Sequence, residues 1–183
     1  MQIQQRPYLS DPKQFSNVSD FMAEILARRG VQSEKELDLK LKYLLAPTMK
    51  GLQRAIDLVN DAIDQQLKIV IVGDYDADGA TSTALMILAL REMGANVEYL
   101  VPDRFKYGYG LTPKIADLAF ERFQPDLLIT VDNGISSHAG VKQAQSYGVK
   151  VIITDHHLTT KEIPDAEAVV NPNQLGCDFP SKA

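Results

Sequence analysis

From Lys68 onward, the chain alternates short runs of β-branched residues with amphipathic stretches of helix length. The runs cover residues 69–72, 97–101, 127–131, 151–154 and, more weakly, 168–170. The amphipathic stretches between them cover residues 80–93, 112–123 and 137–147. Continuous apolar strands that alternate with helices are typical of βαβ units, in which helices cover both faces of a parallel sheet. The pattern therefore predicts an α/β fold with a mostly parallel, three-layer sheet.

The residues before this domain predict a short helical region. Ser33 and Glu36 have the spacing of a capping box, which satisfies free N–H groups at a helix start. Apolar residues follow the box at Leu37, Leu39, Leu41, Leu44 and Leu45. An earlier helix over residues 21–27 is expected to stop at Gly30, and apolar spacing predicts a further helix over residues 52–63.

This pattern divides the chain into a helical region, residues 1–66, and an α/β domain, residues 67–183. The sequence ends irregularly after its last predicted strand, so we expect the domain to be incomplete at its C-terminus. Hydrophobic residues make up 45% of the chain, enough to bury a core, but no apolar run reaches the roughly 18 residues of a membrane span. We therefore expect no membrane partner. Cys177 is the single cysteine, which indicates a reducing, cytoplasmic setting.

Acidic and imidazole side chains follow three of the predicted strands directly. In chain order these residues are Asp74, Asp76 and Asp78, then Asp132, and then Asp155, His156 and His157. Ligands bind outside the carboxyl ends of parallel strands, and carboxylates gathered there repel one another unless a cation lies between them. Oxygen ligands suit Mg²⁺ or Mn²⁺, and an imidazole favours Mn²⁺. Bridging carboxylates further suggest a two-metal site that hydrolyses phosphate esters.

Other interpretations of these motifs fit less well. The loop from Asp74 opens like an EF-hand, but its twelfth position is Leu85 where a bidentate Glu is required. A haloacid-dehalogenase-type phosphatase would use Asp76 as a covalent nucleophile, and it leaves His156 and His157 without a role. The formal net charge of −5 argues against binding of nucleic acid by bulk positive charge, but not against a metal enzyme, because metals reverse the local sign.

The acidic motifs resemble those of a known family. Asp-Tyr-Asp-Ala-Asp-Gly at 74–79, Val-Asp-Asn-Gly-Ile at 131–135 and Asp-His-His at 155–157 resemble the first three motifs of the DHH phosphoesterases. The strings at 101–111 and 170–173 resemble those of the bacterial single-strand-specific exonucleases within that family. The resemblance covers nearly the whole chain. It implies a Rossmann-like DHH domain that hydrolyses single-stranded DNA from its 5′ end to mononucleotides, in recombination and repair.

The resemblance also implies a role for each matched residue. The implied metal ligands are Asp74, Asp76, Asp78, Asp132 and His156, with one further ligand expected from beyond this sequence. His157 is expected to face the scissile phosphate, and Asp155 to orient His156. The implied DNA and phosphate contacts are Arg104, Tyr107, Tyr109, Asn133, Gly134, Ser136 and Ser137. A single-strand-binding protein is the implied protein partner.

Two alternatives stay open at this stage. A DHH enzyme could act instead on short oligonucleotides, cyclic dinucleotides or pyrophosphate. The chain could also be a non-catalytic binding module, although such a module need not keep repelling carboxylates together. The family has a fourth acidic motif, which neither Asp165 nor Asp178 matches, so we expect the fragment to have reduced activity or none.

Overall fold

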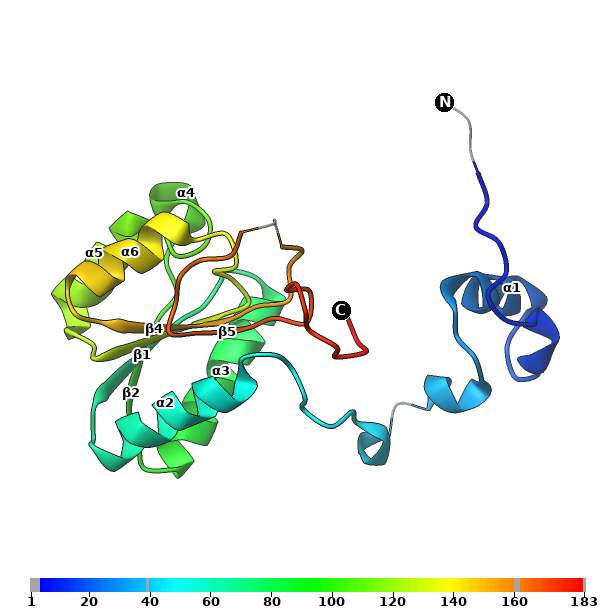
Figure 1. Ribbon diagram of the computed structural model, residues 1–183, viewed down its shortest axis with the longest axis horizontal. Coiled ribbons are helices and arrows are strands. Elements are labelled where there is room, and N and C mark those ends of the chain that lie inside the picture. Colours follow the sequence, from blue (N-terminus) through cyan, green and yellow to red (C-terminus); the bar gives the residue numbers. More distant parts are fainter. Residues whose placement is uncertain (1–3, 39, 160–161, 183) are drawn as a thin grey trace. The chain divides into compact units, whose positions relative to one another are not determined.

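The computed structural model describes residues 4–38, 40–159 and 162–182 (Figure 1). Its internal contacts divide the chain into two compact units, Met1–Ala46 and Pro47–Ala183. In the described part of the chain, no helix combines the length and the apolar character needed to cross a membrane.

The first unit is built around helix α1, Asp20–Arg29. The Ser19 hydroxyl accepts a hydrogen bond from the Met22 N–H at its start, and Gly30 ends it with φ of 84°, which confirms the predicted stop. The described residues of this unit also form three short 3₁₀ helices: η1, Pro12–Gln14; η2, Glu34–Leu37; and η3, Leu41–Tyr43.

The leucines behind the capping box do not extend one continuous helix. The Ser33 N–H does donate to the Glu36 carboxylate at 3.1 Å, but η2 ends at Leu37. Leu44 is 75% exposed, so little apolar burial is available there to stabilise a longer helix. Leu39 lies outside the described residues.

The second unit contains a five-stranded sheet in which every neighbouring pair is parallel. The strand order is β2-β1-β3-β4-β5. The bounds are β1 Lys68–Val72, β2 Asn96–Leu100, β3 Leu127–Val131, β4 Lys150–Thr154 and β5 Ala168–Val170. Each predicted strand is therefore present within one residue, and the α/β prediction is confirmed.

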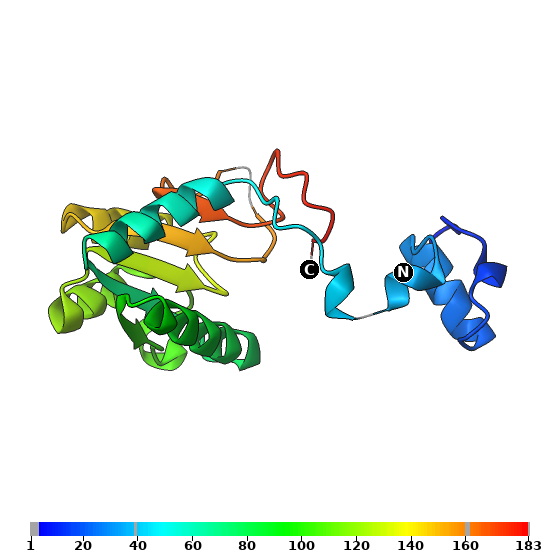
Figure 2. The ribbon, with the colours of Figure 1, turned by 90° about the horizontal axis from the view of Figure 1, so that it is seen from below.

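Helices cover both faces of this sheet (Figures 1 and 2). Their bounds are α2 Leu52–Asp64, α3 Ala77–Glu92, α4 Arg104–Tyr107, α5 Pro113–Phe123 and α6 His138–Ser146. On β1, Val70 and Val72 pack in the layer of α5 and α6, whereas Ile69 and Ile71 pack in the layer of α2 and α3. Helix α2 thus packs on the sheet, although the division at residue 66 placed it with the helical region. That division stays a prediction.

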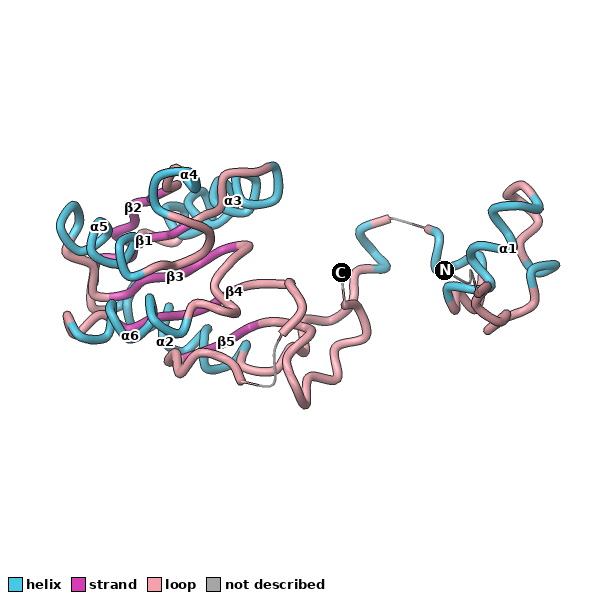
Figure 3. The backbone as a smooth tube through the Cα atoms, turned by 90° about the horizontal axis from the view of Figure 1, so that it is seen from above, coloured by secondary structure: helices cyan, strands magenta, loops and turns pink. Residues whose placement is uncertain are grey.

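The order of the strands reverses between β1 and β3. The chain passes from β1 to β2 on one side and then returns to β3 on the other side. The loops that follow these two strands diverge beyond their carboxyl ends. The place where the strand order reverses is called the switch point, and open α/β sheets bind ligands there. Figure 3 shows the loops that leave β1, β3 and β4 at the same edge of the sheet.

We predict that Gly140→Ala destabilises the second unit. A Cβ atom on Gly140 would lie 1.8 Å from the carbonyl oxygen of Leu111, so α6 would have to move. We expect a loss of about 3 kcal/mol in the free energy of unfolding, although alanine favours helices. Gly94→Ala is the control, because its Cβ meets nothing within 4 Å and its φ of 81° alone should cost about 1 kcal/mol. Equal losses in urea unfolding would contradict the packing argument.

Candidate metal centre

The loop after β1 contributes two carboxylates to the carboxyl edge of the sheet. Asp76 is the N-cap of α3, where its side chain accepts the Gly79 N–H at 3.1 Å. This hydrogen bond holds the pKa of Asp76 below its ordinary value. A Cβ on Gly79 would lie 2.4 Å from the backbone oxygen of Asp74, so only glycine lets the loop pass this close to the helix.

Asp74 is buried, and its two carboxylate oxygens have different surroundings. Its Oδ1 accepts the Tyr75 N–H at 2.6 Å and a guanidinium nitrogen of Arg104 at 2.8 Å. Its Oδ2 is fully buried and has no hydrogen-bond partner within the described ranges. An unpartnered buried carboxylate oxygen is unfavourable unless a cation approaches it. The Asp74 carboxylate therefore fits a metal ligand.

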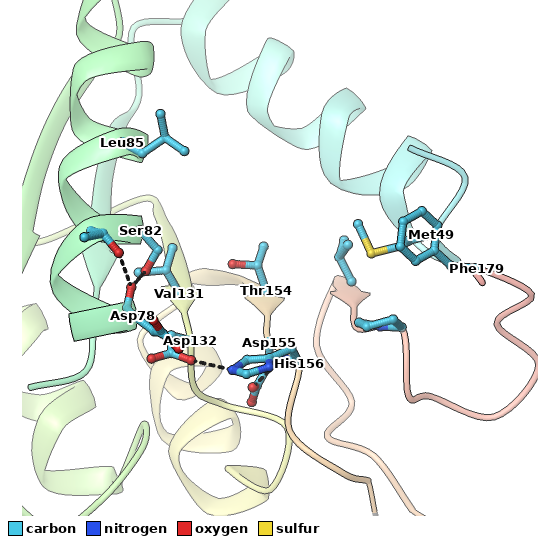
Figure 4. Close-up of a pocket in the computed structure, with 13 residues that line it drawn as sticks. Met49, Asp78, Ser82, Leu85, Val131, Asp132, Thr154, Asp155, His156 and Phe179 are labelled. Carbon is cyan, nitrogen blue, oxygen red and sulfur yellow. Dashed lines mark hydrogen bonds and ion pairs between the residues drawn. The ribbon is translucent and has the colours of Figure 1, made fainter. Parts of the chain in front are cut away.

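Asp132 lies directly after β3 in a left-handed conformation, with φ of 61°. Such a backbone is uncommon outside glycine and is often found at functional sites. Burial, followed by the nearby charge of Asp76, raises the pKa of Asp132. Its Oδ1 lies 3.0 Å from Nε2 of His156 (Figure 4). Asp132 thus faces acidic groups on one side and an imidazole on the other.

Two groups of potential ligand atoms share Asp132. One group consists of Asp74, Asp76 and Asp132, and the other of Asp132, His156 and His157. Within each group the ligand atoms lie within 4.8 Å of one another. A carboxylate common to two such groups is suited to bridging two cations. The sequence predicted this gathering, and the structure brings these residues together.

Asp155 accepts several hydrogen bonds within the loop that carries the histidines. Its Oδ1 accepts the backbone N–H groups of His156 at 2.7 Å and of His157 at 3.0 Å, and contacts Nδ1 of the His157 ring at 2.7 Å. Its Oδ2 accepts the Ile135 N–H at 2.9 Å. Asp155, which was expected to orient His156, binds the backbone N–H of that residue, and the imidazole ring that it contacts is that of His157. The same contact raises the pKa of His157.

Arg104 and Tyr109 lie beside these carboxylates. Arg104 is the first residue of α4, and its guanidinium reaches Asp74 at 2.8 Å and Asp76 at 3.4 Å. The Tyr109 hydroxyl lies 3.3 Å from Nε2 of His157. Burial, and then the surrounding carboxylates, raise the pKa of Tyr109 to about 12, so its phenol stays neutral.

Ser136 and Gly134 line a small cavity beside these groups. The cavity has a volume of about 160 Å³, and Tyr109 and His157 also line it. Gly134 has φ of 113°, and a Cβ there would lie 2.6 Å from the hydroxyl of Thr130. The loop after β3 can therefore turn closely over the strand end only with glycine at this position.

Other predicted site residues have different surroundings. Asn133 is 1% exposed, and its amide donates to the backbone oxygens of Val72 and Val131, which ties the ends of β1 and β3. The Ser137 hydroxyl accepts the Leu111 N–H at 3.0 Å, and Tyr107 packs on the core. The structure therefore gives Asn133 and Tyr107 contacts within the fold rather than at the metal centre, whereas Ser137 also lines the small cavity beside Tyr109 and His157.

Asp78 lies in the first turn of α3 and is exposed. It belongs to neither of the two ligand groups. Together with Asp132 and His156 it lines an open cavity of about 720 Å³ (Figure 4). Asp78 thus lies beside the centre and outside both ligand groups.

The sequence interpretation assigned no role to Asn171 and Asn173, which follow β5. The structure bonds both of them to the loop that carries the histidines. Their Asn-Pro-Asn spacing after a strand is typical of a turn, and that signal alone could not show which loop the amides would contact.

Comparison with known proteins agrees with the fold. The sequence profile of the DHH family, N-terminal domain, matches residues 68–183. The single-stranded-DNA-specific exonuclease RecJ of Escherichia coli is 49% identical over 164 residues, which are 88% of this chain and 28% of that protein. RecJ of Thermus thermophilus is 39% identical over 144 residues, which are 79% of this chain and 21% of that protein.

Solved structures show the same likeness. A crystal structure of exonuclease RecJ bound to manganese matches with a TM-score of 0.68 and 38% identity, over 76% of this chain and 35% of that one. RecJ of Thermus thermophilus in complex with Mn²⁺ matches with a TM-score of 0.69 and 34% identity, over 90% of this chain and 23% of that one.

The fold and the site define an α/β protein with a carboxylate–histidine centre at the switch point of its sheet. The chain belongs to the DHH family, as its motifs predicted. It spans 28% of the length of the Escherichia coli relative, so the match covers only part of that longer protein.

We predict that Asp155 controls the titration of His157. Because the Asp155 carboxylate stabilises the imidazolium, the His157 ring should titrate above 6.5 in metal-free buffer, and Asp155→Asn should lower its pKa. A raised folded-state pKa means that the contribution to stability is complete below 6.5 and is lost as the pH rises through the folded-state value. NMR titration of the ring measures this directly. Asp165→Asn is the control, and an equal effect of both variants would contradict the assignment.

Proposed function

We propose that this chain forms the metal-binding part of a 5′-to-3′ exonuclease that degrades single-stranded DNA to mononucleotides in recombination and repair. The observation that carries the proposal is the position of Asp132, which two groups of ligand atoms share. The relatives support it, since the matching curated proteins are named single-stranded-DNA-specific exonucleases. Because the chain spans only part of those relatives, the proposed activity belongs to the longer protein.

The proposed cofactor is Mn²⁺ or Mg²⁺ at a two-metal site. Asp74, Asp76, Asp132 and His156 would hold it, since their donor atoms are carboxylate oxygens and one imidazole nitrogen. The buried, unpartnered oxygen of Asp74 supports this assignment. When bound, such ions activate water as a nucleophile and neutralise charge on the phosphate oxygens. The relatives of known structure are described as bound to manganese.

The residues around this centre have separate roles in the proposed reaction. When Nδ1 of His157 carries a proton it donates to Asp155, which leaves Nε2 facing Tyr109 and the small cavity. The protonated ring can give its Nε2 proton to the oxygen that leaves phosphorus. The Arg104 guanidinium can bind a phosphate through two parallel hydrogen bonds, and the Tyr109 ring can stack on a base.

Two further proposals concern the cellular setting. Single strands in cells are covered by single-strand-binding proteins, so such a protein is the proposed partner. The proposed location is the cytoplasm, because the substrate is DNA and the only cysteine, Cys177, forms no internal disulfide.

Metal binding by the chain itself tests the centre. Asp132→Asn removes the shared carboxylate and should weaken Mn²⁺ binding about a hundredfold, as measured by calorimetry. Asp61→Asn removes the same charge from the exposed surface of α2 and should leave the affinity within about twofold. Equal affinities of the two variants for Mn²⁺ would overturn the proposed site.

A labelled oligonucleotide tests the reaction. The complete protein that carries this sequence should release a 5′ label from single-stranded DNA as a mononucleotide in Mn²⁺, and release nothing in EDTA. Asp76→Ala should abolish release, whereas Asp61→Asn should not. Earlier release of a 3′ label would reverse the proposed polarity. Cleavage of short oligonucleotides or pyrophosphate alone would favour the alternative DHH activities.

A further inference from the structure

The loop that carries the two histidines lies outside any helix or strand. It follows β4 directly, and no sheet ladder holds the peptide groups of His156 and His157. Backbone N–H and C=O groups at such a place need partners from elsewhere in the fold. The Asp155 carboxylate supplies an acceptor for both N–H groups, at 2.7 and 3.0 Å. The two carbonyl groups have different partners.

The turn after β5 supplies these partners through two asparagine side chains. The Asn173 amide donates to the carbonyl oxygen of His156 at 2.5 Å, and the Asn171 amide donates to that of His157 at 3.0 Å. Asn171 is fully buried. Its own Oδ1 accepts the Asn173 N–H at 2.7 Å, which links the two asparagines to each other.

The peptide group between the two histidines is therefore held at both ends. Its C=O accepts from Asn173, and its N–H donates to Asp155. The peptide groups on the outer sides of His156 and His157 are held by Asp155 and Asn171 respectively. Because a peptide unit is planar, fixing the units on both sides of a Cα fixes the direction of its Cα–Cβ bond, from which the imidazole ring extends.

We propose that Asn171 and Asn173 are positioning residues that aim the two imidazoles of the candidate metal centre. Their amides set the direction of His156 toward Asp132 and of His157 toward Asp155. The inference rests on the proposed function in one respect only, which is that His156 binds a metal ion. The aiming of the rings is a property of the chain alone.

Gln174 offers a matched control within the same turn. It is 5% exposed, and its amide donates to the backbone oxygens of Val169 at 2.8 Å and of Lys50 at 3.0 Å. Neither bond reaches the histidines. Gln174→Leu thus removes buried hydrogen bonds from the turn without touching the carbonyls that Asn171 and Asn173 hold.

The first test needs no metal. Asn173→Leu removes the amide without adding charge, at a position that is only partly buried. We expect amide hydrogen exchange at His156 and His157 to become about tenfold faster in this variant, because the loop loses a hydrogen bond. Gln174→Leu should leave exchange at the two histidines unchanged. Unchanged exchange in Asn173→Leu, or the same acceleration in Gln174→Leu, would overturn the proposal.

The second test measures Mn²⁺ affinity by electron paramagnetic resonance of the free ion. Asn173→Leu should weaken binding about 10- to 100-fold, as losses of residues that orient ligands do, and Gln174→Leu should change it less than about twofold. If both variants weaken Mn²⁺ binding equally at equal thermal stability, the turn has only a structural role and the positioning proposal is overturned. If the unmodified chain binds no Mn²⁺, the proposed metal centre fails, while hydrogen exchange still decides the positioning role.

Discussion

Electrostatic repulsion among carboxylates at the edge of the sheet is the constraint on which the site depends. Asp74, Asp76 and Asp132 place donor oxygens within 4.8 Å of one another. Like charges this close raise one another's free energy, and burial of Asp74 and Asp132 adds to it. A rigid framework must hold them there. The central strands β1, β3 and β4 provide it, since most of their side chains are buried on both faces of the sheet.

The fold offsets this repulsion unequally among the carboxylates. Asp155 accepts backbone N–H groups of His156, His157 and Ile135, so the protein itself satisfies its charge. Asp76 is stabilised by its position at the start of α3. Asp74 and Asp132 are satisfied less completely, by Arg104 and His156. The carboxylates that most need a cation are thus those that face the switch point between β1 and β3.

Much of this arrangement could be predicted from the sequence. Runs such as 127–131 are apolar except for Thr130, which favours strands buried on both faces, and the structure confirms them. The meeting of Asp76 with Asp132 followed from the topology alone, because carboxyl ends of parallel strands share an edge. The spacing of residues along the sequence did not show the conformation of the loops. The pairing of Asp155 with His157 and the inward turn of Asn133 both depend on backbone directions that no periodic pattern encodes.

The leucines of the first unit also show where prediction from local sequence fails. A capping box and a series of leucines favour a helix, but a short helix is marginal unless tertiary packing buries its apolar face. Leu44 and Leu45 are exposed, and η3 ends before them at Tyr43. Local propensity therefore predicted the elements that pack on the sheet well, and predicted this region poorly.

At the proposed site, divalent cations would lie at the switch point between carboxylates that repel one another without them. The most direct measurement is anomalous diffraction at the manganese edge from crystals grown with Mn²⁺. We expect an anomalous peak in contact with Asp132 and with Asp74 or Asp76. Crystals in which Mn²⁺ binds elsewhere, with these carboxylates free of any ion at saturating Mn²⁺, would contradict the proposed site.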